Sequence, residues 1–251
     1  MMRLRHRLNA GDTVLGTFYK TPHPMILEIL AMAGFDTVVI DAEHAPFGRA
    51  EIDTAILTGR ALGLDMVVRL PDDRPATILQ VMDAGAAGLL IPHVNTAGQA
   101  RAILSAMRYG AGGRGFAGTT RAAGYGKRPL HEHLGADRGD VALICQIEDP
   151  EGAENAADIA SVEGVDGLFV GRADLAVGSG KDDFFDPEIA QATARILGTP
   201  GAATGLYCAA HEDLAAHHAA GARLFVVGSD HTAILRGAPV ADWQGSLSDP
   251  K

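Results

Sequence analysis

The sequence of 251 residues has two cysteines, few aromatic residues and no long apolar run. Two cysteines, Cys145 and Cys208, are too few for a disulfide framework, so we expect both to be reduced. No segment approaches the roughly 18 apolar residues of a membrane span, and the basic start MMRLRHRLNAGD is not followed by the apolar core of a signal peptide. These absences predict a cytoplasmic protein without a membrane partner.

Positive charge is also scarce, because 21 Lys and Arg face 31 Asp and Glu, a formal net charge of −10. This excess of negative charge repels nucleic acids, so none is an expected partner. A Schiff-base aldolase needs a lysine in a desolvated interior, and Lys20 in FYKTPHP is the one lysine at the end of a predicted strand. Lys20 is a weak candidate for this role. The sequence also has no phosphate-loop pattern, so we expect no nucleotide cofactor.

The sequence does contain a regular alternation of two kinds of segment. Short runs of β-branched and apolar residues alternate with longer segments of helical spacing, which is typical of a parallel sheet. Eight strands close a barrel of roughly 250 residues, so we predict a single (β/α)8 TIM-barrel domain over residues 1–251, with a doubly wound open sheet as the alternative. The predicted strands are residues 14–18, 36–41, 65–70, 88–92, 142–148, 167–171, 203–207 and 223–228.

Ionisable side chains follow several of these runs where the apolar residues stop. In VVIDAEHAPF, Asp41, Glu43 and His44 follow three β-branched residues. Leaving such groups unpaired in the core would cost several kcal/mol, and barrels build their active sites at the carboxyl ends of strands. We therefore predict a site at this rim. The other runs end in or lead to Arg69, Gln146, Glu148 and Asp174.

Two carboxylates at this rim suggest a metal site. Neighbouring strands lie ~4.8 Å apart, so Glu148 and Asp174 could meet at one cation. Two carboxylates with water and substrate oxygens form a typical Mg2+ or Mn2+ site. The alternative is that both residues cap helices, because EDPEG and RADLA resemble helix starts.

His44 and Arg69 each have a catalytic and a structural interpretation. A carboxylate such as Asp41 on one ring nitrogen of His44 would fix its tautomer and leave the other nitrogen as a base, whereas a lone loop histidine is often a surface residue. Arg69 beside a cation could stabilise a developing oxyanion, or it could pair with a carboxylate on the rim.

Several motifs, in this order and spacing, resemble the HpcH/HpaI class II pyruvate aldolases over almost the whole chain. The motifs are DAEHAPF, the strand ending in Arg69, GLLIPHV, QIE, GRADLA and RGFAGTTRAAGYG. The resemblance implies a (β/α)8 barrel that reversibly cleaves 4-hydroxy-2-oxo acids to pyruvate, or a related 2-oxo acid, and an aldehyde. It also implies a divalent cation, Mg2+, Mn2+ or Co2+, and a hexamer, a trimer of dimers that exchange C-terminal helices.

The resemblance assigns catalytic roles to individual residues. Glu148 and Asp174 match the metal ligands, and Arg69 matches the arginine that binds the oxo group and stabilises the enolate. His44, held by Asp41, matches the histidine that helps to remove the proton from the C4 hydroxyl.

The resemblance also assigns the substrate contacts. Gln146 matches a residue around the bound oxo acid, the backbone of Ala173 and Asp174 matches the carboxylate contact, and Leu206 matches a residue on the aldehyde side. Glu43 is expected to support its loop.

Two departures from the family pattern concern specificity. Gly171-Arg172 stands where family members commonly have Gly-Pro, and no proline follows Tyr109. Loops as long as residues 108–130 are usually functional or oligomer contacts, and we expect this one to shape the aldehyde side. The alternative functions are a CoA-ester lyase of related barrel chemistry and a non-catalytic 2-oxo acid binding protein.

Overall fold

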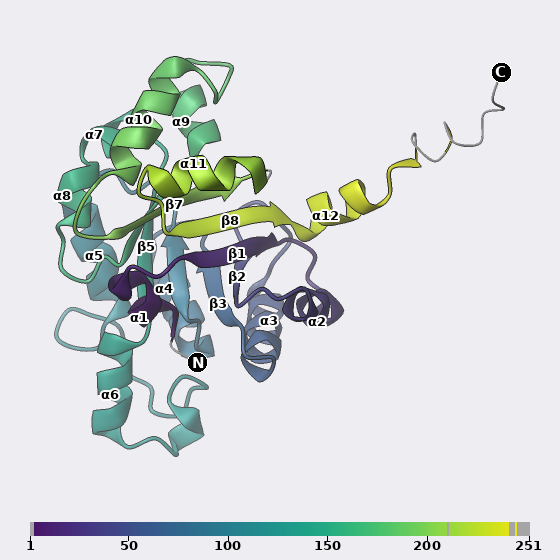
Figure 1. Ribbon diagram of the computed structural model, residues 1–251. Helices are drawn as coiled ribbons and strands as arrows, with labels where there is room; N and C mark the ends of the chain where they lie inside the picture. Colours follow the sequence, from purple (N-terminus) through teal and green to yellow (C-terminus); the bar gives the residue numbers. More distant parts are fainter. Residues whose placement is uncertain (1–2, 210, 241–243, 245–251) are drawn as a thin grey trace, which may run out of the picture.

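The computed structural model describes residues 3–209, 211–240 and 244, and its centre is a closed barrel of parallel strands (Figure 1). Each strand pairs with the next one in the chain, and β8 pairs with β1 to close the barrel. All eight predicted strands are present, so the predicted fold is confirmed and the open sheet is excluded. The strands are β1 Val14–Tyr19, β2 Thr37–Asp41, β3 Asp65–Arg69, β4 Gly88–Ile91, β5 Ala142–Ile147, β6 Gly167–Val170, β7 Ala203–Cys208 and β8 Leu224–Ser229.

Helices surround the barrel and connect successive strands (Figure 1). Segment 151–161, whose spacing predicts one helix, is divided at Asn155, whose side-chain amide donates to the Asn95 carbonyl at 2.8 Å. The helices are α1 Leu4–Ala10, α2 Pro24–Met32, α3 Arg49–Ala61, α4 Pro75–Ala84, α5 Ala97–Met107, α6 Leu130–Gly139, α7 Pro150–Glu154, α8 Ala156–Ala160, α9 Arg172–Gly178, α10 Pro187–Leu197, α11 Leu214–Ala219 and α12 Asp230–Gly237, with 3-10 turns η1 Gly124–Gly126 and η2 His211–Asp213.

The strands bury apolar side chains on both faces, as expected for a parallel barrel. Alternate residues of each strand fall into an outer cluster, packed between strands and helices, and an interior cluster inside the barrel. Cys145 and Cys208 lie in the outer cluster as free, buried thiols, which agrees with the expectation of reduced cysteines.

Helix α1 was not expected from the sequence, and it packs against the interior of the barrel. Its residues Leu4 and Leu8 are buried in the interior cluster. Their i, i+4 spacing places both on one helix face. Helix α1 therefore contributes two residues to the core.

Helix α12 leads away from the barrel instead of packing along it (Figure 1). Asp230 is the buried residue of this helix, while Ile234 and Leu235 are exposed. This exposed apolar surface is compatible with the predicted exchange of C-terminal helices, which stays a prediction. Trp243 lies in the C-terminal tail, for which the sequence leaves docking on a partner subunit or on its own barrel open, and it is outside the described residues.

Within the described residues, no helix combines the length and apolarity needed to cross a membrane. The cytoplasmic location stays a prediction.

Candidate active site

The carboxyl ends of β2, β3 and β5 direct polar side chains into the barrel. Asp41, Arg69 and Gln146 each lie two residues after a member of the interior cluster. Because side chains along a strand alternate between its faces, all three point toward the barrel axis. Each is at most 8% exposed, so their polar groups must find partners within the site.

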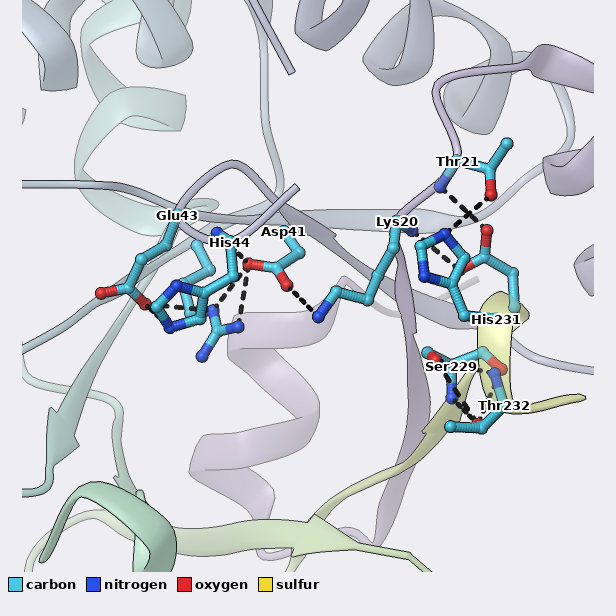
Figure 2. A network of polar contacts seen from close by, with 10 residues as sticks. Lys20, Thr21, Asp41, Glu43, His44, Ser229, His231 and Thr232 are labelled. Atoms are coloured by element: carbon cyan, nitrogen blue, oxygen red, sulfur yellow. Dashed lines mark hydrogen bonds and ion pairs between the residues drawn. The ribbon is translucent and has the colours of Figure 1, made fainter. Parts of the chain in front are cut away.

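Asp41 is the centre of a cluster of ion pairs (Figure 2). Nη2 and Nε of Arg69 donate to its Oδ1 at 2.8 and 3.1 Å, and Nζ of Lys20 lies 2.9 Å from its Oδ2. Burial by itself would raise the pKa of Asp41, but Arg69, Lys20 and the His44 amide more than offset this effect, and the net pKa is lowered. Asp41 therefore carries a negative charge whose partners are all supplied by the protein.

Arg69 is held by two carboxylates and an aromatic ring. Besides its bonds to Asp41, its Nε lies 3.3 Å from Oε2 of Glu43, and its guanidinium carbon lies 4.6 Å from the centre of the Phe18 ring. The predicted pairing of Arg69 with a rim carboxylate is thus confirmed. These contacts among the described residues use Nε and Nη2, so Nη1 remains available to a substrate.

The predicted contact between the Asp41 carboxylate and the His44 ring is wrong. The backbone amide of His44, not its ring, donates to Oδ1 of Asp41 at 3.1 Å. The Asp41 oxygens are already occupied by Arg69 and Lys20, so the ring lies outside the cluster with its Nε2 3.6 Å from Oε2 of Glu43 (Figure 2). Its side chain is 56% exposed at the rim, in reach of a substrate.

Glu148 is a second buried carboxylate, 1% exposed, in a different environment. It accepts a hydrogen bond from the side-chain amide of Gln146 and one from the backbone amide of His93, the latter at 3.0 Å. No lysine or arginine pairs with it among the described residues. Burial raises its pKa, the bonds from Gln146 and His93 reverse only part of this rise, and the charge of Asp174 adds to it.

His93 is a site residue that our sequence reasoning missed. It follows β4 with a positive φ of 53°, a conformation that few residues other than glycine adopt. Its Nδ1 lies 3.6 Å from Oε1 of Glu148 and 3.0 Å from Oδ2 of Asp149. Burial lowers the pKa of His93, but Asp149, Glu148 and Glu43 together raise it. Its place directly after Pro92 in GLLIPHV was the available signal.

The predicted metal ligands Glu148 and Asp174 lie on the same part of the rim. Asp174 is exposed in the first turn of α9, and its charge is close enough to affect the pKa of Glu148. Gly171 leaves the space for Glu148, because a Cβ there would lie 2.6 Å from Oε2 of Glu148. A second possible donor set shares Glu148, since ligand atoms of Glu43, His93 and Glu148 lie within 4.8 Å of one another.

The comparison with protein families agrees with this site. The model of the HpcH/HpaI aldolase/citrate lyase family matches residues 15–236. The chain belongs to this family. It is therefore an enzyme of the lyase class, and the family is metal-dependent.

Relatives within the family are similar over nearly their full length. The hydroxypyruvate/pyruvate aldolase of Roseovarius nubinhibens is 34% identical over 244 residues, 94% of this chain and 95% of that protein. The 4-hydroxy-2-oxovalerate aldolase of Novosphingobium aromaticivorans is 34% identical over 237 residues, 92% of this chain and 89% of that protein. A crystal structure of a family member from Burkholderia cenocepacia has a TM-score of 0.90 at 31% identity, covering 97% of this chain and 98% of that chain.

The carboxylates at the rim fit the cation that the family requires. Glu148 is buried and pairs with no lysine or arginine among the described residues, and hard carboxylate oxygens are the donors that Mg2+ and Mn2+ prefer. Burial is the largest cause of the raised pKa of Glu148, and the charge of Asp174 adds to it.

The predicted role of Leu206 on the aldehyde side is not supported by its position. Its side chain is fully buried in the outer cluster, between the barrel and the helices. The next residue, Tyr207, faces the interior, where its ring centre lies 6.0 Å from that of Phe18. Because neighbouring strand residues point to opposite faces, Tyr207 and not Leu206 is directed at the interior.

Loop 108–130 contacts the opposite end of its own barrel. The amide of Ala122 donates to the carbonyl of Asp83, near the C-terminus of α4, and Arg114 pairs with the Asp83 carboxylate at 3.0 Å. Helix α4 leads back from the rim, so these contacts lie near the amino ends of the strands. Any contribution of this loop to an active site would have to reach that of another subunit.

Arg172, which replaces the usual proline, is tied to the strand that follows. Its Nη2 donates to the carbonyl of Tyr207 at 3.1 Å, and its guanidinium lies 5.7 and 5.9 Å from the ring centres of Phe184 and Phe185. Arg172 thereby links the start of α9 to the aromatic segment before α10.

Proposed function

We propose that this family member cleaves a 4-hydroxy-2-oxo acid to pyruvate, or a related 2-oxo acid, and an aldehyde, with Mg2+, Mn2+ or Co2+ held by Glu148 and Asp174. The observation that carries the proposal is the buried Glu148 carboxylate, which pairs with no lysine or arginine among the described residues and is close enough to Asp174 for the two charges to interact. The named aldolases among its relatives support the same reaction class.

The bound cation would act as a Lewis acid on the oxygens of the 2-oxo acid. Arg69 adds a fixed positive charge at the rim, and its free Nη1 donates to the oxo oxygen, where negative charge develops as the C3–C4 bond breaks. Asp41 is a positioning residue, because it holds the Arg69 guanidinium through Nε and Nη2.

The remaining rim groups bind the acid and move the proton. Gln146 lies beside Glu148 and faces the oxo acid. The backbone amides of Ala173 and Asp174 lie in the first turn of α9, where amides lack carbonyl partners within the helix, and they donate to the substrate carboxylate. The exposed His44 ring accepts the C4 hydroxyl proton, and the electron pair of the C3–C4 bond moves to the 2-oxo acid fragment.

Deuterium exchange at the methyl group of pyruvate, followed by NMR, tests the proposal without knowledge of the aldehyde. We expect exchange with Mn2+ or Mg2+ and none in a chelator, with recovery when the metal is returned. Full exchange in chelator would contradict the proposal. Tight pyruvate binding without exchange would favour a non-catalytic binding protein, and cleavage of a malyl thioester would favour a CoA-ester lyase.

Mn2+ binding measured by calorimetry separates the two donor sets. If Glu148 and Asp174 hold the cation, Asp174→Asn weakens Mn2+ binding strongly and Glu43→Gln changes it little. The opposite result would assign the cation to the set of Glu43, His93 and Glu148.

The same proposal includes assembly into a trimer of dimers with exchanged C-terminal helices. Its support is the exposure of Ile234 and Leu235 on α12, which leads away from its own barrel. Light scattering of the full chain is expected to give the mass of a hexamer, and a monomeric mass would exclude this assembly.

A further inference from the structure

A cavity of about 350 Å³ lies at the amino end of the barrel, opposite the candidate active site. Its wall includes residues 63–66 and 85–87, which lead into β3 and β4, together with parts of α6 and loop 108–130. Strand β3 has five residues, so its amino and carboxyl ends lie ~13 Å apart. The cavity is therefore distinct from the rim where Arg69 and Glu148 lie.

Positive side chains are concentrated on this wall. Arg3 pairs with Asp140, and Arg114 pairs with Asp83. Within the described residues, no carboxylate pairs with Arg60 or Arg128. The wall arginines are Arg3, Arg60, Arg114 and Arg128.

Arg60 is an exposed residue in the last turn of α3, and the charges of three other arginines act on its guanidinium group. It packs against the bare Cα of Gly85, where a Cβ would lie 2.4 Å from its Nη1. Burial lowers the pKa of Arg60, and the charges of Arg121, Arg3 and Arg128 lower it further. Like charges so arranged repel one another unless an anion lies between them.

The carboxylates on the cavity wall do not supply this anion. Asp140 is engaged by Arg3. Asp65, whose pKa is raised chiefly by burial, forms no ion pair with Arg60 or Arg128 among the described residues. Arg60 and Arg128 thus retain uncompensated positive charge in a protein whose net charge is −10.

We propose that this cavity binds a small oxyanion with two negative charges, a phosphate group or a compact dicarboxylate, between Arg60 and Arg128 with Arg3 beside it. Guanidinium groups recognise such oxyanions through paired N–H donors. A volume of about 350 Å³ admits an ion of this size together with water. The inference does not depend on the proposed aldolase reaction.

Isothermal titration of the purified full chain with inorganic phosphate and with malonate, at constant ionic strength, tests this inference. We expect saturable binding of at least one of the two anions, and the stronger binder identifies the ligand class. Arg60→Gln and Arg128→Gln should each weaken binding about tenfold, as expected for the loss of a charge-assisted contact. Arg101→Gln, at an exposed position on α5 away from the cavity wall, is the matched control and should bind as the wild type does.

An Arg69→Ala variant separates this site from the rim. Phosphate or malonate binding that survives Arg69→Ala but weakens in the Arg60 and Arg128 variants supports the inference. Absence of binding, or binding lost only in Arg69→Ala, overturns it. Because each substitution removes repulsion, neither cavity variant should have a lower Tm than the wild type in anion-free buffer, so a folding defect would also count against the inference.

Discussion

Two carboxylates at the same rim, Asp41 and Glu148, are equally buried, at 0% and 1% exposure, and differ in the sign of their pKa shifts. Two cationic side chains and an amide lower the pKa of Asp41 in spite of its burial. Burial dominates at Glu148, whose partners are an amide side chain, a backbone amide and the His93 ring, and its pKa is raised.

The opposite pKa shifts indicate a structural role for Asp41 and a functional role for Glu148. The charge of Asp41 is balanced within the fold, so Asp41 orders Arg69 and Lys20. The charge of Glu148 is not balanced by any lysine or arginine among the described residues, so a bound cation has a favourable place beside it. A buried carboxylate with a raised pKa indicates a functional site when no lysine or arginine balances its charge.

Replacing Glu148 by Gln should have the largest effect. Loss of the cation ligand is expected to lower kcat/KM for pyruvate release about 10²- to 10³-fold, as for removal of an electrostatic stabiliser. Excess Mn2+ should restore part of the activity. Glu154→Gln, at an exposed position on neighbouring α7, is the control and should retain activity.

Asp41→Asn should destabilise the fold more than it affects metal binding. It leaves Arg69 and Lys20 without their shared counter-charge, and we expect a loss of about 2–4 kcal/mol in the free energy of unfolding, after allowance for the partial exposure of Lys20. Chemical denaturation measures this. As the control, Asp72→Asn breaks the solvent-exposed pair with Arg74 and should not change the free energy of unfolding measurably. An equal loss of stability in both variants would contradict the special role of the Asp41 pairs.

Gly171→Ala should displace Glu148 and leave the ion pairs of Asp41 unchanged. The added methyl would lie 2.6 Å from Oε2 and 2.7 Å from Cβ of Glu148, so the carboxylate must move. We expect Mn2+ affinity to fall about tenfold, as for other changes that displace a ligand. Gly135→Ala on α6, where a Cβ meets nothing within 4 Å, is the control; unchanged Mn2+ affinity in Gly171→Ala would argue against Glu148 as a ligand.

The pH dependence of stability should show the smallest effect. A lowered pKa in the folded state means that the stabilisation by Asp41 is fully present above the ordinary value of 3.8 and is lost as the pH falls through the lowered pKa. The difference in unfolding free energy between the wild type and Asp41→Asn should therefore shrink between about pH 5 and about pH 2. A difference that stays constant over this range would show that the charge of Asp41 is not the cause.

The sequence was sufficient to predict the barrel because the alternation of strands and helices is a local property. A second alternation, that of side chains within a strand, bears on the assignment of Leu206 to the site. Residues of β7 alternate between faces, so Leu206 and Tyr207 cannot both point inward, and the partner register of β7 with β8 assigns the interior to Tyr207. The motif match had selected Leu206 without this test.

Contacts between distant segments were not predictable in the same way. The choice of Arg69 and Lys20 over the His44 ring as partners of Asp41 depends on three side chains from three different strand ends. Asp230, the first residue of α12, accepts hydrogen bonds from the amides of Lys20 and Thr21 at 2.8 and 2.9 Å, while Ser229 caps the helix. Neither outcome is encoded in a local pattern.

The bond between Asp230 and the amides after β1 joins residues about 210 positions apart. During translation, β1 therefore leaves the ribosome long before its last partner exists, and Lys20 has no anchored backbone in the meantime. Contacts between residues so far apart in the sequence form more slowly than local contacts. A nascent chain that stops before β8 would display Asp41 and Arg69 without the anchor of Lys20, so the rim becomes complete only when β8 and Asp230 have been made.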